Sequence, residues 1–593
     1  MKTRKKRQRH GISRLFSGVK IFGGLLFSLY GGGGGGGRIR NFLPLFAGLL
    51  ILFGLLSYLS PPINEHGHIS HYSSSQNAGK GRLYAEKVNE FRVPRGGGSS
   101  GRELWSTRGS QFFYGCSNST NKFLSAESST HPNRYLLIAT SGGLNQQRTG
   151  IVDAVVAAYM LNATLVIPSL DQQSYWKDAS NFSEIFEVDW FISQLEKDVR
   201  IIKELPTTRG KATTPYTTRA PRKCNAQCYQ TRILPLLEKK HTVLLTKFDY
   251  RLSNNLATNL QKLRCRVNYH GLKFTDSIND MGRKLVERMR MKSKHFVALH
   301  LRFESDMLAF SGCTYGFGEK ERNTLAAIRR RWKTLHVNPE KQRRKGRCPL
   351  TPEEVGLLLR ALGYGDDVHI YVASGDIFGG EETIAPLKAL FPNLHTKESI
   401  ASQEELAPFS SYSSRMAALD YIVCDESDVF VTNNNGNMAK ILAGRRKYFG
   451  HKPTIRPNAK KLGKVFNNRD NMTWDEFSSL VQTRQIGFMG EPNEVKPGIG
   501  VFHENPAACI CSSSEAMGEA RLLTQRNVII GQEVEDGHVN EATDEHFSED
   551  LLDPDSMENE NTIEIGELLM KMDMNTSTFE QPEQPELEVI LSD

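Results

Sequence analysis

The sequence predicts an α/β protein with two Rossmann-like units behind an N-terminal transmembrane helix. Residues 133–168 read in turn as a buried strand, a glycine-containing turn, an apolar stretch at helical spacing and a second strand, which is how a Rossmann-like unit opens. The same order restarts at His295. Residues 42–60 contain no charge, and a stretch of this length can cross a bilayer.

The first unit is expected over residues 111–290. Its opening strand is R-Y-L-L-I-A-T, which is followed by the turn S-G-G-L-N-Q-Q, a helix over 149–161 and the strand T-L-V-I-P. We expect the two units to meet near residues 285–295.

The second unit is expected over residues 291–460 and repeats the alternation of short apolar runs with helical periodicity. The expected strands lie at 295–302, 368–374 and 428–432, and the expected helices at 352–362, 381–390, 413–424 and 437–446. Residues 461–511 would form a C-terminal extension. The segment 329–347 carries nine Lys or Arg against one Glu, and a solvated insertion is favoured over a docking surface for acidic glycans.

The charge distribution around residues 42–60 predicts their orientation. The first 40 residues carry ten Lys or Arg and no Asp or Glu, so residues 1–41 would be a cytoplasmic tail and everything after the span would be lumenal. A cleaved signal peptide is the rival reading, but its apolar core would be shorter and nearer the start. Residues 61–110 are rich in Gly, Ser and His and are expected to form a stem.

The net charge of +9 conceals a division along the chain. The residues from Glu515 onward carry −19, and the first 514 carry +28. Residues 512–593 are therefore expected to be an acidic, disordered tail. Nucleic-acid binding is not expected, because most of the basic residues would face the lumen or the membrane surface.

All nine cysteines lie beyond the predicted span, where a lumenal compartment would favour disulfides, and the odd count leaves at least one unpaired. The pair Cys224 and Cys228 lacks the accompanying Cys or His pair that a zinc site needs. Sequons for N-glycosylation begin at Asn118, Asn162, Asn181, Asn471 and Asn575.

The run H-L-R-F-E-S-D places four charged or polar side chains at the end of the second unit's first strand, at alternating positions. They are His300, Arg302, Glu304 and Asp306. Side chains at alternating positions share a face for as long as a strand continues. A guanidinium suits a diphosphate, and ligands of open α/β sheets bind at strand ends. The alternative is an arginine that only pairs with its neighbouring carboxylates.

Three further strand ends carry polar residues or glycines. A turn or a helix cap would explain each of them separately, but together with the first cluster they predict a ligand site. They are Gly142 and Gly143; Ser374 and Asp376; and Asn434, Asn435, Gly436 and Asn437. No D-x-D motif lies in the folded part, so we expect Arg302 and backbone amides to neutralise a nucleotide diphosphate without a metal or other cofactor.

At these motifs the chain resembles the plant O-fucosyltransferase-like family, which consists of Golgi type II membrane proteins with a two-domain GT-B fold. The resemblance spans residues 130–511. It is carried by S-G-G-L-N-Q-Q-R-T-G-I-V-D-A-V, H-L-R-F-E-S-D-M-L-A-F-S-G-C, C-P-L-T-P-E-E-V-G-L-L-L-R-A-L-G, S-D-V-F-V-T-N-N-N-G-N-M-A-K-I-L-A-G-R-R and F-H-E-N-P-A-A-C-I-C.

The resemblance implies GDP-fucose as the donor substrate and a protein or glycan as the acceptor. Arg302 would contact the pyrophosphate with His300 beside it, while Gly143 and Asn145 would lie near the donor. Asp376 becomes a possible guanine contact, and the 434–437 loop would lie near a phosphate.

One departure from the family pattern concerns the catalytic base. Some protein O-fucosyltransferases carry a Glu just before the first-loop glycine, where this chain has Thr140 and Ser141. An inverting transfer to an acceptor hydroxyl is still expected. Glu304 or Asp306 is the hypothesis for the base, and the alternative is that both only orient Arg302.

Two other functions stay open at this point. Similar plant proteins use UDP-rhamnose on cell-wall polysaccharide, and nothing in the sequence decides between the nucleotides. A membrane-tethered glycan-binding protein without turnover is the candidate from another class, although His300, Arg302 and the first loop argue against it.

Overall fold

A computed structural model describes residues 91–513 of the chain, apart from 97–103, 120–122, 124, 174–177, 208–212, 331–337, 435, 493 and 495–501. The predicted cytoplasmic tail, membrane span and acidic tail lie outside the described residues, except for residues 512 and 513. Within the described part, no helix is both long and apolar enough to span a membrane.

The first unit contains a five-stranded parallel sheet with the order β4-β3-β2-β6-β5. The central strand β2 is also the first in sequence, and neighbours on its two sides come from different parts of the chain. The bounds are β2 Tyr135–Ile138, β3 Thr164–Val166, β4 Ile201–Ile202, β5 Tyr216–Thr218 and β6 Thr242–Leu245.

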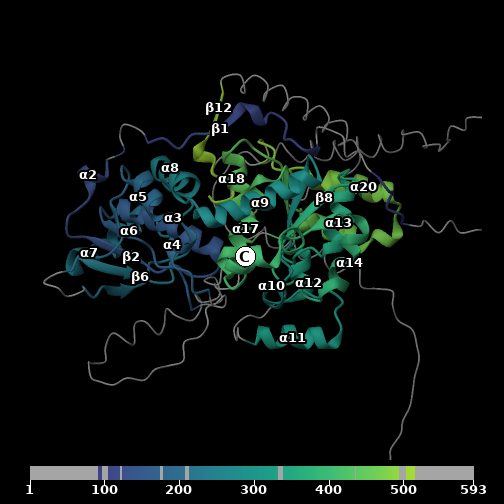
Figure 1. Cartoon of the computed structure of the whole chain (residues 1–593), viewed down its shortest axis with the longest axis horizontal. Helices are drawn as coiled ribbons and strands as arrows, with labels where there is room; N and C mark the ends of the chain where they lie inside the picture. The colour runs from purple at the N-terminus through teal and green to yellow at the C-terminus, as the bar shows by residue number, and fades with distance from the viewer. Residues whose placement is uncertain are drawn as a thin grey trace, which may run out of the picture. The chain divides into compact units, whose positions relative to one another are not determined.

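The second unit repeats this architecture with the order β11-β10-β7-β8-β9, again entirely parallel. Numbered along the chain this is the 3-2-1-4-5 order of a Rossmann sheet, which reverses direction between β7 and β10. The bounds are β7 Phe296–His300, β8 His369–Ala373, β9 Leu394–His395, β10 Val429–Thr432 and β11 Thr454–Ile455. The predicted pair of α/β units is therefore present (Figure 1).

Helices connect the strands of both units. In the first unit they are α2 Ala126–Ser129, α3 Leu144–Met160, α4 Phe182–Ile185, α5 Val188–Leu195, α6 Ala226–Arg232, α7 Leu234–Lys240, α8 Thr258–Arg266 and α9 Asp276–Lys292. In the second they are α10 Ser305–Ser311, α11 Glu319–Arg329, α12 Pro339–Arg344, α13 Pro352–Ala361, α14 Gly380–Leu390, α15 Lys397–Ile400, α16 Gln403–Ser410, α17 Ser413–Glu426, α18 Asn437–Tyr448, α19 Ala459–Asn467 and α20 Trp474–Gln485.

The first connecting helix begins earlier than its apolar pattern predicts. Apolar periodicity places the start at Thr149, but α3 starts at Leu144, directly after Gly143. The first turn of α3 reads L-N-Q-Q and is fully enclosed by protein. A buried polar turn carries no hydrophobic periodicity, so the pattern misses it.

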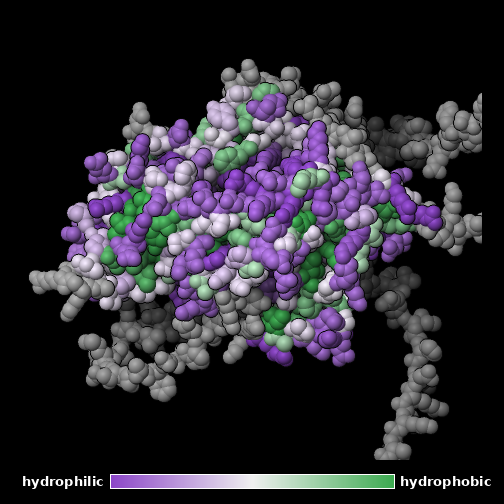
Figure 2. All heavy atoms as spheres, viewed as in Figure 1, coloured by the Kyte–Doolittle hydropathy of each residue, from purple (hydrophilic) through white to green (hydrophobic). Residues whose placement is uncertain are grey.

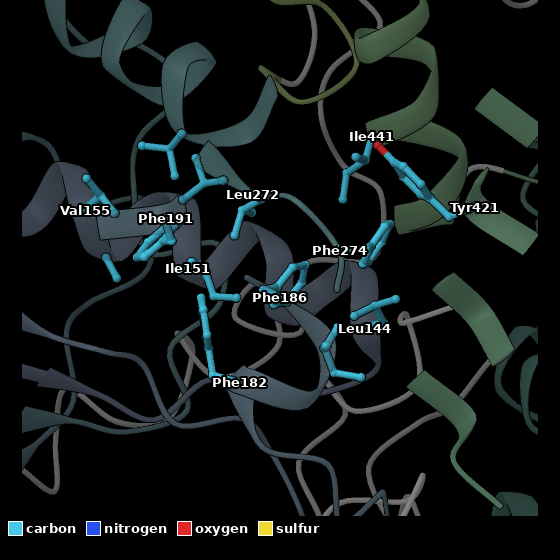
Figure 3. Close-up of a cluster of buried hydrophobic side chains, with 14 of the residues drawn as sticks. Leu144, Ile151, Val155, Phe182, Phe186, Phe191, Leu272, Phe274, Tyr421 and Ile441 are labelled. Carbon is cyan, nitrogen blue, oxygen red and sulfur yellow. The ribbon is translucent and has the colours of Figure 1, made fainter. Parts of the chain in front are cut away.

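Both faces of the second sheet are buried. Phe296 and Ala298 of β7 face a core that they share with the first unit, while Val297 and Leu299 face a separate core under α13, α19 and α20. Such burial on both faces is typical of parallel sheets. Figure 3 shows the shared core, in which Tyr421 of α17 lies near α3 and Phe274.

Several segments outside the two sheets pack against the two units. Helix α9 packs along α17, and hydrophilic residues form a band over α9 on the face shown in Figure 2. At the end of the predicted stem, Phe91 packs edge-on against Trp474 and Phe477, and Leu104 accepts a hydrogen bond from the Tyr364 hydroxyl at 2.8 Å. This part of the predicted stem is therefore packed against the second unit.

The C-terminal extension returns to the first unit. Strand β12 (Ile510–Ser512) pairs antiparallel with β1 (Phe113–Gly115) beside the 3₁₀ turns Ser110–Phe112 and Ala507–Cys509. Two disulfides fasten it, Cys116–Cys511 and Cys265–Cys509, which close separations of 395 and 244 residues. The other pairs are Cys224–Cys228 and Cys313–Cys348, and Cys424 is free and buried.

The zinc reading of Cys224 and Cys228 is thereby excluded, because the two thiols are joined in a disulfide. The four sequon asparagines in the described part, Asn118, Asn162, Asn181 and Asn471, are all exposed. Their glycosylation stays a prediction, and Asn575 lies outside the described residues.

We expect the long-range disulfide to stabilise the fold more than the short one. In the chain-entropy model, a disulfide stabilises by about 5 kcal/mol for a loop of this longer size and about 2 kcal/mol for one of a few residues. The double variant Cys265→Ala/Cys509→Ala should therefore lower the melting temperature much more than Cys224→Ala/Cys228→Ala. Equal losses in the two double variants would contradict the prediction.

Candidate functional site

The candidate site lies where the second sheet reverses its strand order. Strands β7 and β10 are neighbours there, and their last residues His300 and Thr432 are paired in register. Side chains two residues apart in a strand lie on the same face. His300 and Thr432 therefore share the face of Ala298 and Phe430, which belong to the core shared with the first unit. Ligands of open α/β sheets bind at this point, outside the carboxyl ends of the strands.

Arg302 is the centre of the charged cluster and is 1% exposed. Its Nη1 donates to Glu304 Oε2 at 2.7 Å, and its guanidinium makes a two-point contact with Asp306, at 3.2 and 2.7 Å. The three groups carry a net charge of −1 when ionised. Burial lowers the pKa of Arg302, but the two carboxylates outweigh it and hold this pKa above its usual range.

The expected shared strand face ends at His300. Strand β7 stops there, and Glu304 serves as the N-cap of α10, so Arg302 meets Asp306 through the turn into a helix. The four residues do gather, but by a change of secondary structure, because the strand does not continue. The predicted contact between Arg302 and a diphosphate stays a prediction.

His300 is a neutral group in this cluster. Burial lowers its pKa to about 3, and the charges of Arg302 and Lys397 act in the same direction. Its Nδ1 is buried and has no hydrogen-bond partner among the described residues. A neutral imidazole in this position can offer a hydrogen bond to a ligand without adding charge.

Asn433 fixes the backbone on which Arg302 sits, and the sequence patterns did not single it out. Its Oδ1 accepts from the Arg302 amide at 2.8 Å, and its Nδ2 donates to the carbonyls of Arg302 at 3.2 Å and Leu350 at 3.1 Å. The side chain is 1% exposed. The only signal for it is its place in the run N-N-N after a strand.

The loop after β8 is held from two sides. Glu304 Oε1 accepts from the Gly375 amide at 2.9 Å, and Lys397 Nζ donates to the Ser374 carbonyl at 2.9 Å. Lys397 is 4% exposed and pairs with Asp420 at 2.8 Å. Asp376 is exposed beside this loop. Lys397 lies on a separate helix, so no local pattern links it to the site.

The asparagine loop after β10 leads into the N-terminus of α18. Gly436 is the N-cap, and its amide donates to Asn434 Oδ1 at 3.1 Å, while Asn435 lies outside the described residues. The Tyr250 hydroxyl donates to Asn437 Oδ1 at 2.5 Å. Tyr250 follows β6 of the first sheet, so this bond joins the strand ends of the two units.

The first loop faces the same junction from the other sheet. Gly142 has φ +86°, a backbone conformation that favours glycine, and its amide donates to Asp171 Oδ2 at 2.9 Å. Gly143 is the N-cap of α3, and Asn145 is fully buried in its first turn. The first-loop and asparagine-loop residues that the sequence assigned to the donor thus lie at the starts of α3 and α18, and these two helices contact each other.

Some of the buried polar atoms that lack a protein partner lie at these strand ends. Within the described part of the chain they include Ser141 Oγ, His300 Nδ1, Thr432 Oγ1 and Asn434 Nδ2. Buried polar groups in folded proteins are nearly always hydrogen-bonded. The arrangement therefore suits a ligand with many hydroxyl and phosphate oxygens. In the part of the chain that the structure describes, no group of three or more His, Cys, Asp or Glu is arranged to hold a metal.

Comparison with known proteins identifies the family. The model of the family GDP-fucose protein O-fucosyltransferase matches residues 135–449. A protein of Arabidopsis thaliana named O-fucosyltransferase 16 is 59% identical over 568 residues, covering 94% of this chain and 98% of that protein. Rhamnogalacturonan I rhamnosyltransferase 1 of the same plant is 43% identical over 393 residues, covering 64% and 77%.

A solved structure of POFUT1 in complex with GDP-fucose is 15% identical, with a TM-score of 0.35, covering 55% of this chain and 98% of that chain. The family model covers more than half of the chain, and two of the relatives, O-fucosyltransferase 16 and O-fucosyltransferase 6, each match 94% of it. The chain is a glycosyltransferase that belongs to the GDP-fucose protein O-fucosyltransferase family.

Proposed function

We propose that this protein transfers fucose from GDP-fucose to a hydroxyl of a protein or glycan acceptor, with inversion and without a metal ion. The observation that carries the proposal is the set of unpartnered buried polar atoms at the ends of β2, β7 and β10, beside the first turns of α3 and α18. The family description and the names of the relatives support fucose as the sugar.

The phosphates of the donor would lie at the N-terminus of α18. Free amides at the start of a helix, together with the helix dipole, favour an anion there. The Asn434 and Gly436 region supplies such a turn, and His300 lies on the neighbouring strand. Arg302 already contacts two carboxylates, so we assign it to the wall behind the phosphates, where it holds Glu304 and Asp306 in place.

The loop after β8 would receive the guanine. Asp376 is exposed at the strand end, and a carboxylate there can accept hydrogen bonds from the N–H groups of that base. The Lys397 and Glu304 contacts hold the loop on both sides, so its position does not depend on the ligand.

In the reaction, the acceptor oxygen attacks the anomeric carbon opposite the leaving diphosphate. The bond from carbon to phosphate oxygen breaks, GDP leaves with the electron pair, and the acceptor proton passes to a base. Of the two carboxylates considered, Glu304 suits this role better, because its side chain is 15% exposed while that of Asp306 is 2% exposed.

A second candidate function is transfer of another sugar, such as rhamnose from UDP-rhamnose, onto a cell-wall polysaccharide. The 43% identity with a protein named as a rhamnosyltransferase favours this candidate. The two functions would use the same phosphate site, and their donors differ in the nucleotide base and in the sugar.

We also propose a Golgi location, as a single-pass type II protein with the catalytic region in the lumen. Four disulfides in the described residues support an oxidising compartment. The uncharged residues 42–60 supply the proposed anchor.

A panel of nucleotide sugars tests the proposed donor. The full-length protein should release GDP from GDP-fucose, with transfer to acceptor, and should keep this activity in EDTA. The controls are GDP-mannose, which shares the GDP of the donor but not the sugar, and UDP-rhamnose, which shares neither the guanine base nor the sugar. Turnover of UDP-rhamnose alone would move the function to the second candidate, and loss of activity in EDTA would contradict metal independence.

Paired variants test the base. Glu304→Gln should lower kcat by about 10²–10⁴-fold, the usual contribution of a positioned base. GDP affinity should fall much less than kcat, because the glutamine oxygen can still accept from the Gly375 amide of the proposed guanine loop. Asp306→Asn is the matched control and should mainly lower the melting temperature, because it breaks a buried ion pair. Unimpaired turnover in both variants would remove both carboxylates from the role.

A further inference from the structure

The motif F-H-E-N-P of the C-terminal extension has no role in the site described so far. It contains His503, which is 1% exposed. The nearby disulfides Cys265–Cys509 and Cys116–Cys511 fasten the extension to the first unit. The C-terminal extension thus brings a histidine into the body of the molecule.

His503 lies against α18 and beside Tyr250. Its carbonyl oxygen approaches Gly444 so closely that any side chain at that position would collide with it. Its ring contacts the ring of Tyr250 edge-on, with centroids 5.9 Å apart. The Tyr250 hydroxyl in turn donates to Asn437 at the start of α18.

The charges around His503 come from α3, α8 and α18. Burial lowers the pKa of His503 well below its usual range, and Arg264, Lys440 and Arg148 act in the same direction. Arg148 and Lys440 each lie three residues after an asparagine of the candidate site, which is about one turn along their helices. The imidazole is therefore neutral.

Both ring nitrogens of His503 are buried and without a hydrogen-bond partner in the described residues. A neutral imidazole has one N–H donor and one acceptor nitrogen. A phosphate only accepts hydrogen bonds and would leave the acceptor nitrogen unpaired. Hydroxyl groups both donate and accept hydrogen bonds, so one or two sugar hydroxyls would supply the hydrogen-bond partners of both ring nitrogens.

We propose that His503 is a substrate-binding residue whose two ring nitrogens hydrogen-bond sugar hydroxyls held beside Tyr250, near the start of α18. The inference rests on the proposed function, because it needs a sugar at the junction of the two units. The hydroxyls belong either to the donor sugar or to an acceptor glycan. The C-terminal extension is then part of the substrate site.

The test compares His503→Phe with His451→Phe in the full-length protein. Phenylalanine keeps a ring of similar shape and removes both nitrogens. His451 is the matched control, because it is also a buried histidine, 3% exposed, but follows the C-terminal end of α18, about 18 Å from Gly436 along the helix. The readouts are melting temperature, GDP affinity, donor hydrolysis without acceptor, and transfer to acceptor.

We expect His503→Phe to lower kcat/KM at least tenfold while GDP affinity changes less than twofold, because GDP carries no sugar to be transferred. A raised KM in donor hydrolysis assigns the hydroxyls to the donor sugar, and a raised KM for the acceptor alone assigns them to the acceptor. His451→Phe should change neither KM. His503→Gln, which keeps one donor and one acceptor, should recover part of the loss and replaces His503→Phe if that variant fails to fold.

Wild-type kinetics in His503→Phe and His503→Gln would overturn the inference and leave the proposed function intact. An equal loss of GDP affinity would also overturn it, because the role would then not be sugar recognition. A wild-type protein that turns over no nucleotide sugar would contradict the proposed function and the inference together.

Discussion

The packing of α3 against α17 and α18 is the constraint on which the site depends. It places Leu144 in one apolar core with Tyr421 and Ile441 from the other unit (Figure 3). Arg148 is buried at this contact with its guanidinium 4.4 Å from the Tyr421 ring centroid and 5.1 Å from that of Phe274. Because the first turns of α3 and α18 carry the candidate ligand groups, this contact also sets the distance between them.

Buried charge at the site is balanced by pairing within the protein. Arg302 is paired with Glu304 and Asp306, and Lys397 is paired with Asp420. Glu304 and Lys397 also bond the backbone of the loop after β8. A buried charge without a partner is costly, so removing one member of such a pair disturbs more than the contact itself. Asn433 adds uncharged support by bonding the amide and carbonyl of Arg302. The loops therefore have fixed positions before any ligand arrives.

The sequence predicted the alternation of strands and helices because apolar runs and their spacing report burial directly. It therefore located β7, β8, β10 and α18 closely. It misplaced the start of α3, where polar residues are buried, and it extended the β7 face past His300, where the chain turns into α10. Local patterns describe neighbours in the chain. Lys397, Tyr250 and His503 reach the site from distant segments, so no local pattern assigns them.

The C-terminal extension shows why such residues depend on long-range constraints. Residues 502–513 contain one short strand, and their apolar contacts alone are few. Two disulfides and the β1–β12 pairing hold this segment against the first unit, while Gly444 lets its backbone approach α18. Without the disulfides, the segment would be held by the β1–β12 pairing, the Arg456–Glu504 ion pair and the contacts of Phe502 with Asn254 and Arg264.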